Sequence, residues 1–194
     1  MKLNKIFVGI VLCFMTSHAM SQTDNAQPKR HRFTIYGGVG PNYYFNNLVI
    51  AKNSVNELNY SFVGRIMWEP EHRLSLGIES GYYRLYTLNF KGARQTKIVN
   101  SATPIQLVIG MKIHKTFYFN FSMGISILTN DITTNFAGDF DAKGLSAADF
   151  TGTLGYKRKL NERFSLSAET KVFYSSHAVD GNIALAFVGG YSFK

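Results

Sequence analysis

Apolar and polar residues alternate along most of the chain, so that similar side chains recur at every second position. Between Phe117 and Ile127, one set of alternate positions holds Phe, Met and Ile, and the other holds Tyr, Asn, Ser and Gly. Between Phe164 and Val172, a set of Phe, Leu, Ala, Thr and Val alternates with Ser, Glu and Lys. Successive side chains of a β-strand point to opposite faces. The pattern therefore predicts strands with one mainly apolar and one mainly polar face.

Eight segments show this alternation, and no comparable helical stripe occurs beyond the N-terminal region. The segments cover residues 31–45, 58–68, 73–86, 104–113, 117–129, 148–158, 163–174 and 182–193. Each is close to, or slightly longer than, the roughly 9 to 11 residues that a tilted strand needs to cross a bilayer. No apolar run reaches the roughly 18 residues of a membrane-spanning helix. We therefore expect an all-β chain.

Short and long connections between these segments alternate along the chain. Short turns follow the second, fourth and sixth segments, at residues 69–72, 114–116 and 159–162. Polar and mostly longer connections follow the other segments, at residues 46–57, 87–103, 130–147 and 175–181. Antiparallel strands place the two classes at opposite ends of a sheet, as in outer-membrane barrels with short periplasmic turns and longer external loops. The order predicts an eight-stranded antiparallel up-and-down transmembrane β-barrel.

The size of the side chains indicates which face of this barrel is outside. The apolar face is rich in Phe, Leu, Ile and Met, and the other face in Gly, Ser, Ala and Thr. The interior of an eight-stranded barrel is narrow and filled by its own side chains, so we expect the small residues inside. A Lys or Arg on the lipid face near the midplane costs about 2–4 kcal/mol. We therefore predict a charge network in the lumen, formed by the charged members of the small-residue face: Arg65, Glu79, Lys112, Lys157, Glu169 and Lys171.

Aromatic residues gather at both ends of the predicted lipid-facing surface. Tyr and Trp favour a membrane interface because the ring is buried while its polar atom stays wet. The outward positions at the short-turn end hold Phe33, Trp68, Phe117, Tyr156, Phe164 and Phe193. Those toward the other end hold Tyr60, Tyr82 and Tyr174. We interpret these residues as an aromatic girdle.

The N-terminus has the pattern of a secretory signal peptide. Lys2 and Lys5 precede an apolar run over residues 6–15, and small residues follow, with cleavage expected after Ala19 or Ser21. The predicted organisation is a signal peptide at 1–21, a polar leader at 22–30 and the barrel domain at 31–194. We therefore expect a chain that is exported through this cleaved signal peptide and resides, as a barrel, in the cell outer membrane.

Composition and charge narrow the function classes. Aromatic residues make up 14% of the chain, which excludes a disordered protein, and the one cysteine, Cys13, excludes a disulfide framework. The formal charge is +9, and loss of Lys2 and Lys5 with the signal peptide would leave +7. The basic residues are scattered without a nucleic-acid motif, so anionic lipid is the expected partner rather than nucleic acid.

The chain resembles the eight-stranded OmpA/OmpX-like outer-membrane barrels, and its long polar loops and basic charge are similar to those of PorT-like barrel proteins of Bacteroidetes. The resemblance covers residues 31–194 and includes the ending Gly190 to Phe193, although Lys194 follows it and Val188 stands where such barrels usually have Gly. It implies a cell-envelope protein of a Gram-negative bacterium, a monomer that contacts outer-membrane lipid and lipopolysaccharide. It also implies assembly by the barrel-insertion machinery.

Candidate chemistry is sparse. The cluster of Ser175, Ser176 and His177 with Asp180 contains the residue types of a hydrolytic site, but we interpret it as a polar turn. The His residues lack metal-ligand spacing. The acidic residues Asp131, Asp139, Asp141 and Asp149 are interpreted as a solvated part of the third long loop. We expect no catalytic residue, cofactor or metal.

The sequence favours a non-catalytic outer-membrane barrel, acting as a membrane scaffold, a surface-loop binding or adhesion protein, or an accessory in export. The external loops would carry its specificity, for a ligand that the sequence does not identify. One alternative is a secreted lipocalin-like carrier, which would turn the apolar faces inward around an apolar ligand. The other is a lipid-modifying barrel enzyme, which requires a hydrogen bond between His177 and Ser175 or Ser176.

Overall fold

The computed structural model describes residues 32–45, 55–70, 73–90, 95–136, 138–175 and 180–193, with Asp180 described by its backbone alone. The predicted signal peptide and polar leader lie outside the described residues. None of the described residues forms a helix, so no helix in that part of the chain could span a membrane.

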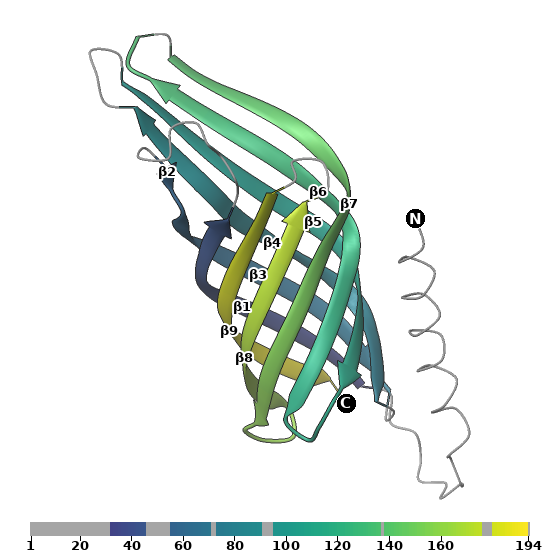
Figure 1. The fold of residues 1–194 in the computed structure, drawn as a ribbon. Coiled ribbons are helices and arrows are strands. Elements are labelled where there is room, and N and C mark those ends of the chain that lie inside the picture. Colours follow the sequence, from purple (N-terminus) through teal and green to yellow (C-terminus); the bar gives the residue numbers. More distant parts are fainter. Residues whose placement is uncertain are drawn as a thin grey trace, which may run out of the picture.

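The described chain forms one closed antiparallel barrel (Figure 1). Its strands are β1 (Arg32–Phe45), β2 (Val55–Asn56), β3 (Leu58–Glu69), β4 (Leu74–Phe90), β5 (Thr96–Lys112), β6 (Phe117–Thr134), β7 (Gly138–Lys159), β8 (Phe164–Ser175) and β9 (Asp180–Phe193). Each long strand pairs with its neighbours in the chain, and β1 pairs with β9 to close the ring. The predicted fold class is therefore confirmed, with β2 as a short addition beside β4.

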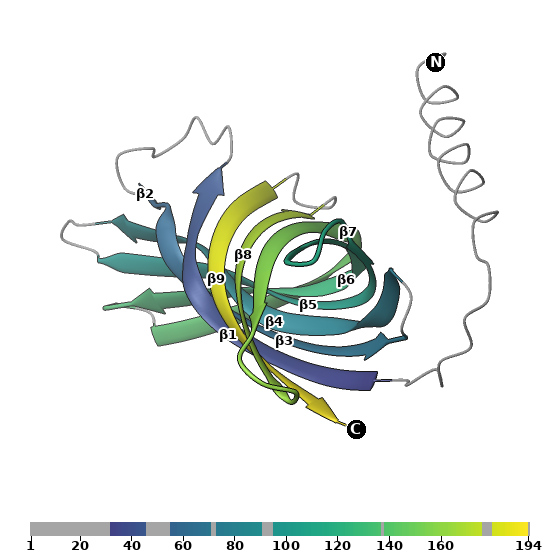
Figure 2. The same ribbon diagram turned by 90° about the horizontal axis from the view of Figure 1, so that it is seen from below.

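Seen from below, the strands are strongly tilted and curve around one another to close the barrel (Figure 2). Its outer face carries the bulky apolar side chains, as the size argument predicted: Phe119, Leu166 and Leu185 are exposed. The inner face carries small and polar residues, and Glu79 and Lys171 are each 1% exposed. A lipocalin-like carrier needs the opposite arrangement, so that alternative is wrong.

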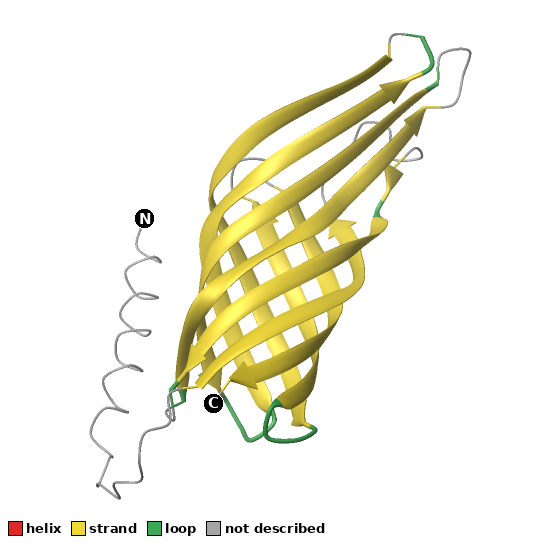
Figure 3. Cartoon of the chain, turned by 180° about the vertical axis from the view of Figure 1, so that it is seen from behind, coloured by secondary structure: helices red, strands yellow, loops and turns green. Residues whose placement is uncertain are grey.

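Two of the predicted long loops are mostly strand. Their described residues, 87–90, 95–103, 130–136 and 138–147, lie mostly in the outer parts of β4, β5, β6 and β7, which project as a sheet beyond the rest of the barrel (Figures 1 and 3). Both faces of this sheet are largely solvent-exposed in β7, where Gly138 to Leu145 are all exposed. The sequence signal of a strand is alternation between a buried and a wet face, and a sheet that is wet on both faces lacks it. The short turns lie at the opposite end, as predicted.

Candidate functional site

The centre of the bore is filled by two pairs of opposite charges. Arg65 Nη1 donates to Glu79 Oε2 at 3.0 Å, and Arg65 Nη2 donates to Glu169 Oε1. Lys171 Nζ donates to Glu79 Oε1 at 2.5 Å and lies 3.7 Å from Glu169 Oε2. We call these four residues the charge plug. All four are buried, and their formal charges cancel, as buried charges require.

Neighbouring strands position the charge plug, and further hydrogen bonds orient it. Arg65 and Glu79 are direct partners in the β3–β4 register. Tyr118 donates its hydroxyl hydrogen to Glu169 Oε1. With its amide oriented to satisfy both of its atoms, Asn120 accepts from Arg65 Nη1 at 2.9 Å. The plug is thus held by groups from β3, β4, β6 and β8.

The structure does not bring the other two predicted lumen charges into the charge plug. Lys157 lies nearer the short-turn end, where Nζ is 3.1 Å from Glu69 Oε1 and donates to the Tyr36 hydroxyl at 2.5 Å. Lys112 is exposed at the end of β5. Both residues occupy strand positions that face the lumen, but they lie at the end where the barrel opens to solvent. The sequence reasoning missed Glu69, whose signal was its spacing of four residues from Arg65 on the same face.

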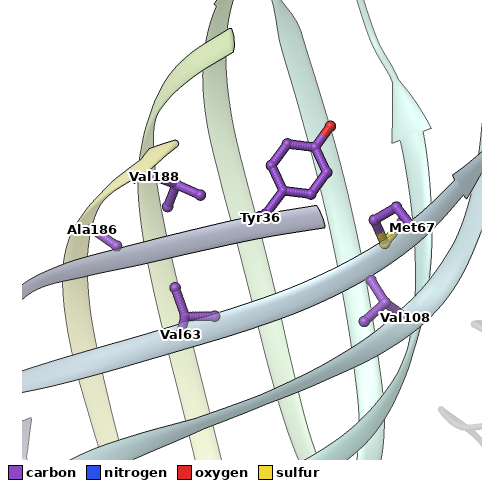
Figure 4. Close-up of a cluster of buried hydrophobic side chains, with 6 residues drawn as sticks. All are labelled: Tyr36, Val63, Met67, Val108, Ala186 and Val188. Carbon is purple, nitrogen blue, oxygen red and sulfur yellow. The ribbon is translucent and has the colours of Figure 1, made fainter. Parts of the chain in front are cut away.

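Apolar side chains surround the charged layer. Tyr36, Val63, Met67, Val108, Ala186 and Val188 form one buried cluster, drawn in Figure 4. The guanidinium of Arg65 lies 5.0 Å from the centre of the Tyr36 ring, a cation–π contact. The cluster therefore places apolar groups next to the paired charges.

The bore is closed again toward the long-loop end by aromatic rings. Tyr83 and Phe173 stack with ring centres 5.2 Å apart and planes inclined by 13°. They pack with Tyr44 and Leu85 in a second buried cluster, which we call the ring layer. Tyr83, Leu85 and Phe173 are almost fully buried. Together the charge plug and the ring layer obstruct the bore at two levels.

The predicted girdle residues all lie on the outer surface. Phe33, Phe117, Tyr156, Phe164, Phe193, Tyr60 and Tyr174 are exposed, and Trp68 and Tyr82 are partly exposed. Several of the rings touch across strands, as Phe117 does with Tyr156 at 5.3 Å between ring centres. Their role at a membrane interface stays a prediction.

The candidate catalytic cluster is only partly described. Ser175 is buried and its Oγ lies 3.0 Å from Ser146 Oγ, whereas His177 lies outside the described residues. Asp149, assigned above to a solvated loop, is instead a buried residue of β7 whose Oδ1 accepts from Ser146 Oγ at 2.6 Å. Ser175 therefore belongs to a polar cluster of the lumen. Within the described ranges, no group of acidic, His or Cys side chains could hold a metal.

The projecting sheet has an open edge along β7. From Gly138 to Leu145, β7 pairs with β6, and its described pairing with β8 begins only at Phe150. Phe140 and Leu145 are exposed on this part of the strand. An unpaired strand edge presents backbone donors and acceptors to any extended segment that approaches it.

These features define an eight-stranded β-barrel with an apolar exterior, an obstructed bore and a sheet that projects from the long-loop end. No family model matches the chain, and no curated protein sequence matches it. The similarity to PorT-like proteins therefore stays a prediction.

Solved structures show the fold. The chain is similar to Ail, the attachment invasion locus protein of Yersinia pestis, solved with the heparin analogue sucrose octasulfate. The two share 10% identity over 84% of this chain and 99% of that one, with a TM-score of 0.55. A second Ail structure gives 10% identity over the same shares and a TM-score of 0.54. Neisserial surface protein A gives 10% identity over 83% and 97% of the two chains, with a TM-score of 0.46.

Proposed function

We propose that this protein is a non-catalytic outer-membrane β-barrel that binds extracellular partners through its projecting sheet. The observation that carries the proposal is the edge of β7 between Gly138 and Leu145, where the described structure has no second neighbouring strand. An extended peptide can add to such an edge through main-chain hydrogen bonds, with side-chain contacts supplying specificity. Exposed Phe140 and Leu145 would supply those contacts.

The location in the outer membrane is supported by the exterior of the barrel. Bulky apolar residues such as Leu107 and Phe187 are 66% and 74% exposed on it. Monomeric soluble proteins rarely expose such continuous apolar surface, whereas a lipid-facing barrel wall requires it. The likeness to Ail supports the same fold without identifying a ligand. We place the barrel in the outer membrane with the projecting sheet outside the cell and the short turns in the periplasm.

Membrane fractionation and gel mobility test the first part of the proposal. We expect the protein in the membrane pellet, with a mobility that shifts when the sample is boiled. We also expect no steady conductance in planar bilayers, because the charge plug and the ring layer fill the bore. A soluble protein without a heat shift would contradict the membrane location, and a stable ion current would contradict the closed bore.

Trimmed hairpins test the binding role. One variant replaces residues 129–143 with Asn-Gly, which joins the paired residues Leu128 and Gly144 and removes most of the open edge. The control replaces residues 89–97 with Asn-Gly, which joins Leu88 and Ile98 and leaves β7 intact. Asn-Gly suits a two-residue hairpin, so both variants should keep the heat shift.

Adhesion of cells that display these variants gives the readout. We expect the full-length barrel to increase retention on surfaces coated with extracellular-matrix protein. The variant trimmed at β6–β7 should lose that increase, and the variant trimmed at β4–β5 should keep most of it. Equal retention by all three proteins and by cells without the barrel would contradict the proposed role.

A further inference from the structure

A cavity of about 650 Å³ opens at the short-turn end of the barrel, opposite the projecting sheet. Its wall includes Tyr36 from β1, Arg65 from β3, and Tyr118 from β6. The charge plug lies at its inner end, so the cavity is a blind pocket rather than a passage. Its volume lies within the range of about 300–1,000 Å³ that is usual for ligand sites.

Among the described residues, the cavity wall carries far more positive than negative charge. Its cations are Arg32, Arg65, Lys112, Lys115, Lys157, Arg158 and Lys159, and its one described carboxylate is Glu69. Arg65 is neutralised within the charge plug, and Lys157 by Glu69. The remaining five cations have no ion pair among the residues that the structure describes. A recess that is lined by one sign of charge and has low-dielectric walls concentrates ions of the other sign.

The positive charges and the apolar surface occupy different parts of the cavity. The unpaired cations lie at strand ends and in the turn after β5, around the mouth. Met67 from β3 and the ring of Tyr118 from β6 contribute apolar wall. The hydroxyls of Tyr36 and Tyr118 are already engaged, donating to Glu69 and Glu169. A matching ligand therefore needs several separated anionic groups and an apolar part between them.

We propose that this basic vestibule, formed by Arg32, Lys112, Lys115, Arg158 and Lys159 around the cavity, binds an acidic peptide segment. Its carboxylates pair with the cations at the mouth, and an apolar side chain enters toward Met67 and the Tyr118 ring. The site lies at the opposite end from the projecting sheet and is independent of what that sheet binds.

The spacing of the cations favours a peptide over a small anion. In the ring, β1 and β7 are separated by β9 and β8, which places Arg32 and Lys159 three strand spacings apart, about 14 Å along the wall. One phosphate group cannot contact both. An extended peptide advances about 3.3 Å per residue, so a segment of roughly five residues reaches across the mouth.

Fluorescence anisotropy tests the proposal with the full barrel in zwitterionic detergent micelles. The probe is a labelled heptapeptide of alternating Glu and Leu, and its counterpart has Lys in place of Glu. We expect only the acidic peptide to bind, and its affinity to fall as salt screens the charges. Equal binding of both peptides would overturn the proposal.

Two double variants with the same change in net charge locate the site. Lys112→Glu with Lys159→Glu reverses charge at two places around the mouth, and we expect affinity to fall about tenfold or more. Lys97→Glu with Lys143→Glu makes the same change on the projecting sheet, where both residues are exposed, and should leave affinity within about twofold. The heat shift on gels verifies that both variants are folded. An equal loss in the two variants would show non-specific attraction and overturn the proposal.

Competition distinguishes a peptide from other anions. Inorganic tripolyphosphate carries several charges and no apolar group, so it should displace the peptide only at much higher concentration than unlabelled peptide does. Equal potency would mean a general anion patch and would overturn the peptide assignment. Loss of peptide binding when a few phosphatidylglycerol molecules are added to each micelle would assign the cations to lipid headgroups instead.

Discussion

The two halves of the bore are closed by different chemistry. Toward the short turns, the charge plug consists of four buried charges, each of which contacts two of opposite sign. Toward the long loops, the ring layer closes the same cylinder with Tyr44, Tyr83, Leu85 and Phe173. Both halves exclude water, but only the first depends on every partner being present.

The difference shows how a narrow barrel can use its interior. The outer face is apolar, so this chain has no need to bury all its large apolar residues inside. The interior can then hold charges, provided that they are paired and hydrogen-bonded. Such a network is stable only when complete, whereas an apolar layer loses stability in proportion to the contacts removed.

Removing one charge from the plug should produce the largest loss of stability. Arg65→Met leaves Glu79 and Glu169 facing each other with Lys171 as their one remaining cation in the plug. Breaking a buried ion pair in this way costs about 3–5 kcal/mol. Urea unfolding of the refolded barrel in micelles, followed by gel mobility or tryptophan fluorescence, measures the change. A decrease in the free energy of unfolding of less than about 1 kcal/mol would contradict a stabilising role of the charge plug.

A fully uncharged plug distinguishes unpaired charge from lost packing. The quadruple variant combines Arg65→Met, Glu79→Gln, Glu169→Gln and Lys171→Met. Replacing a whole buried ion network with groups of similar volume is often neutral or stabilising. We therefore expect this variant to be more stable than Arg65→Met alone. If it is no better, the loss in the single variant reflects packing.

Removing a ring from the ring layer should leave a cavity and lower the free energy of unfolding. Phe173 is 0% exposed and stacks on Tyr83, so Phe173→Ala should cost about 3 kcal/mol. Phe187 on the next strand is 74% exposed on the outer face. Phe187→Ala should cost about 1.5 kcal/mol, because detergent or lipid fills the space and leaves no cavity. Equal losses in the same unfolding experiment would contradict the distinction between inside and outside.

The fold was largely predictable because the barrel wall separates two environments. Residues such as Phe119 face outward and Asn120 inward, and that difference recurs at every second position. The signal disappears where the wall ends. The outer part of β7, including Asp139 and Asp141, is exposed on both faces, so its sequence looks like a loop.

The candidate site was predictable only as a set of inward positions. The alternation of side chains along each strand placed Arg65, Glu79, Glu169 and Lys171 on the inward face. It also placed Lys112 there. This alternation does not say how far along the barrel axis each residue lies, because that position depends on strand tilt and register. The exclusion of Lys112 from the plug therefore required the structure.

The smallest predicted effect concerns one tyrosine hydroxyl in each half of the bore. Tyr118 donates to the buried carboxylate of Glu169 near the plug. The hydroxyl of Tyr83 in the ring layer has no hydrogen-bond partner among the described residues. A hydrogen bond to a charged group is worth about 1.5–3 kcal/mol, so Tyr118→Phe should destabilise the barrel by about 1.5 kcal/mol. Tyr83→Phe removes a buried hydroxyl without such a bond and should leave the free energy of unfolding unchanged or raise it. Since both variants lose the same atom, urea unfolding of the pair compares the polar and apolar halves directly, and equal losses would remove the distinction between them.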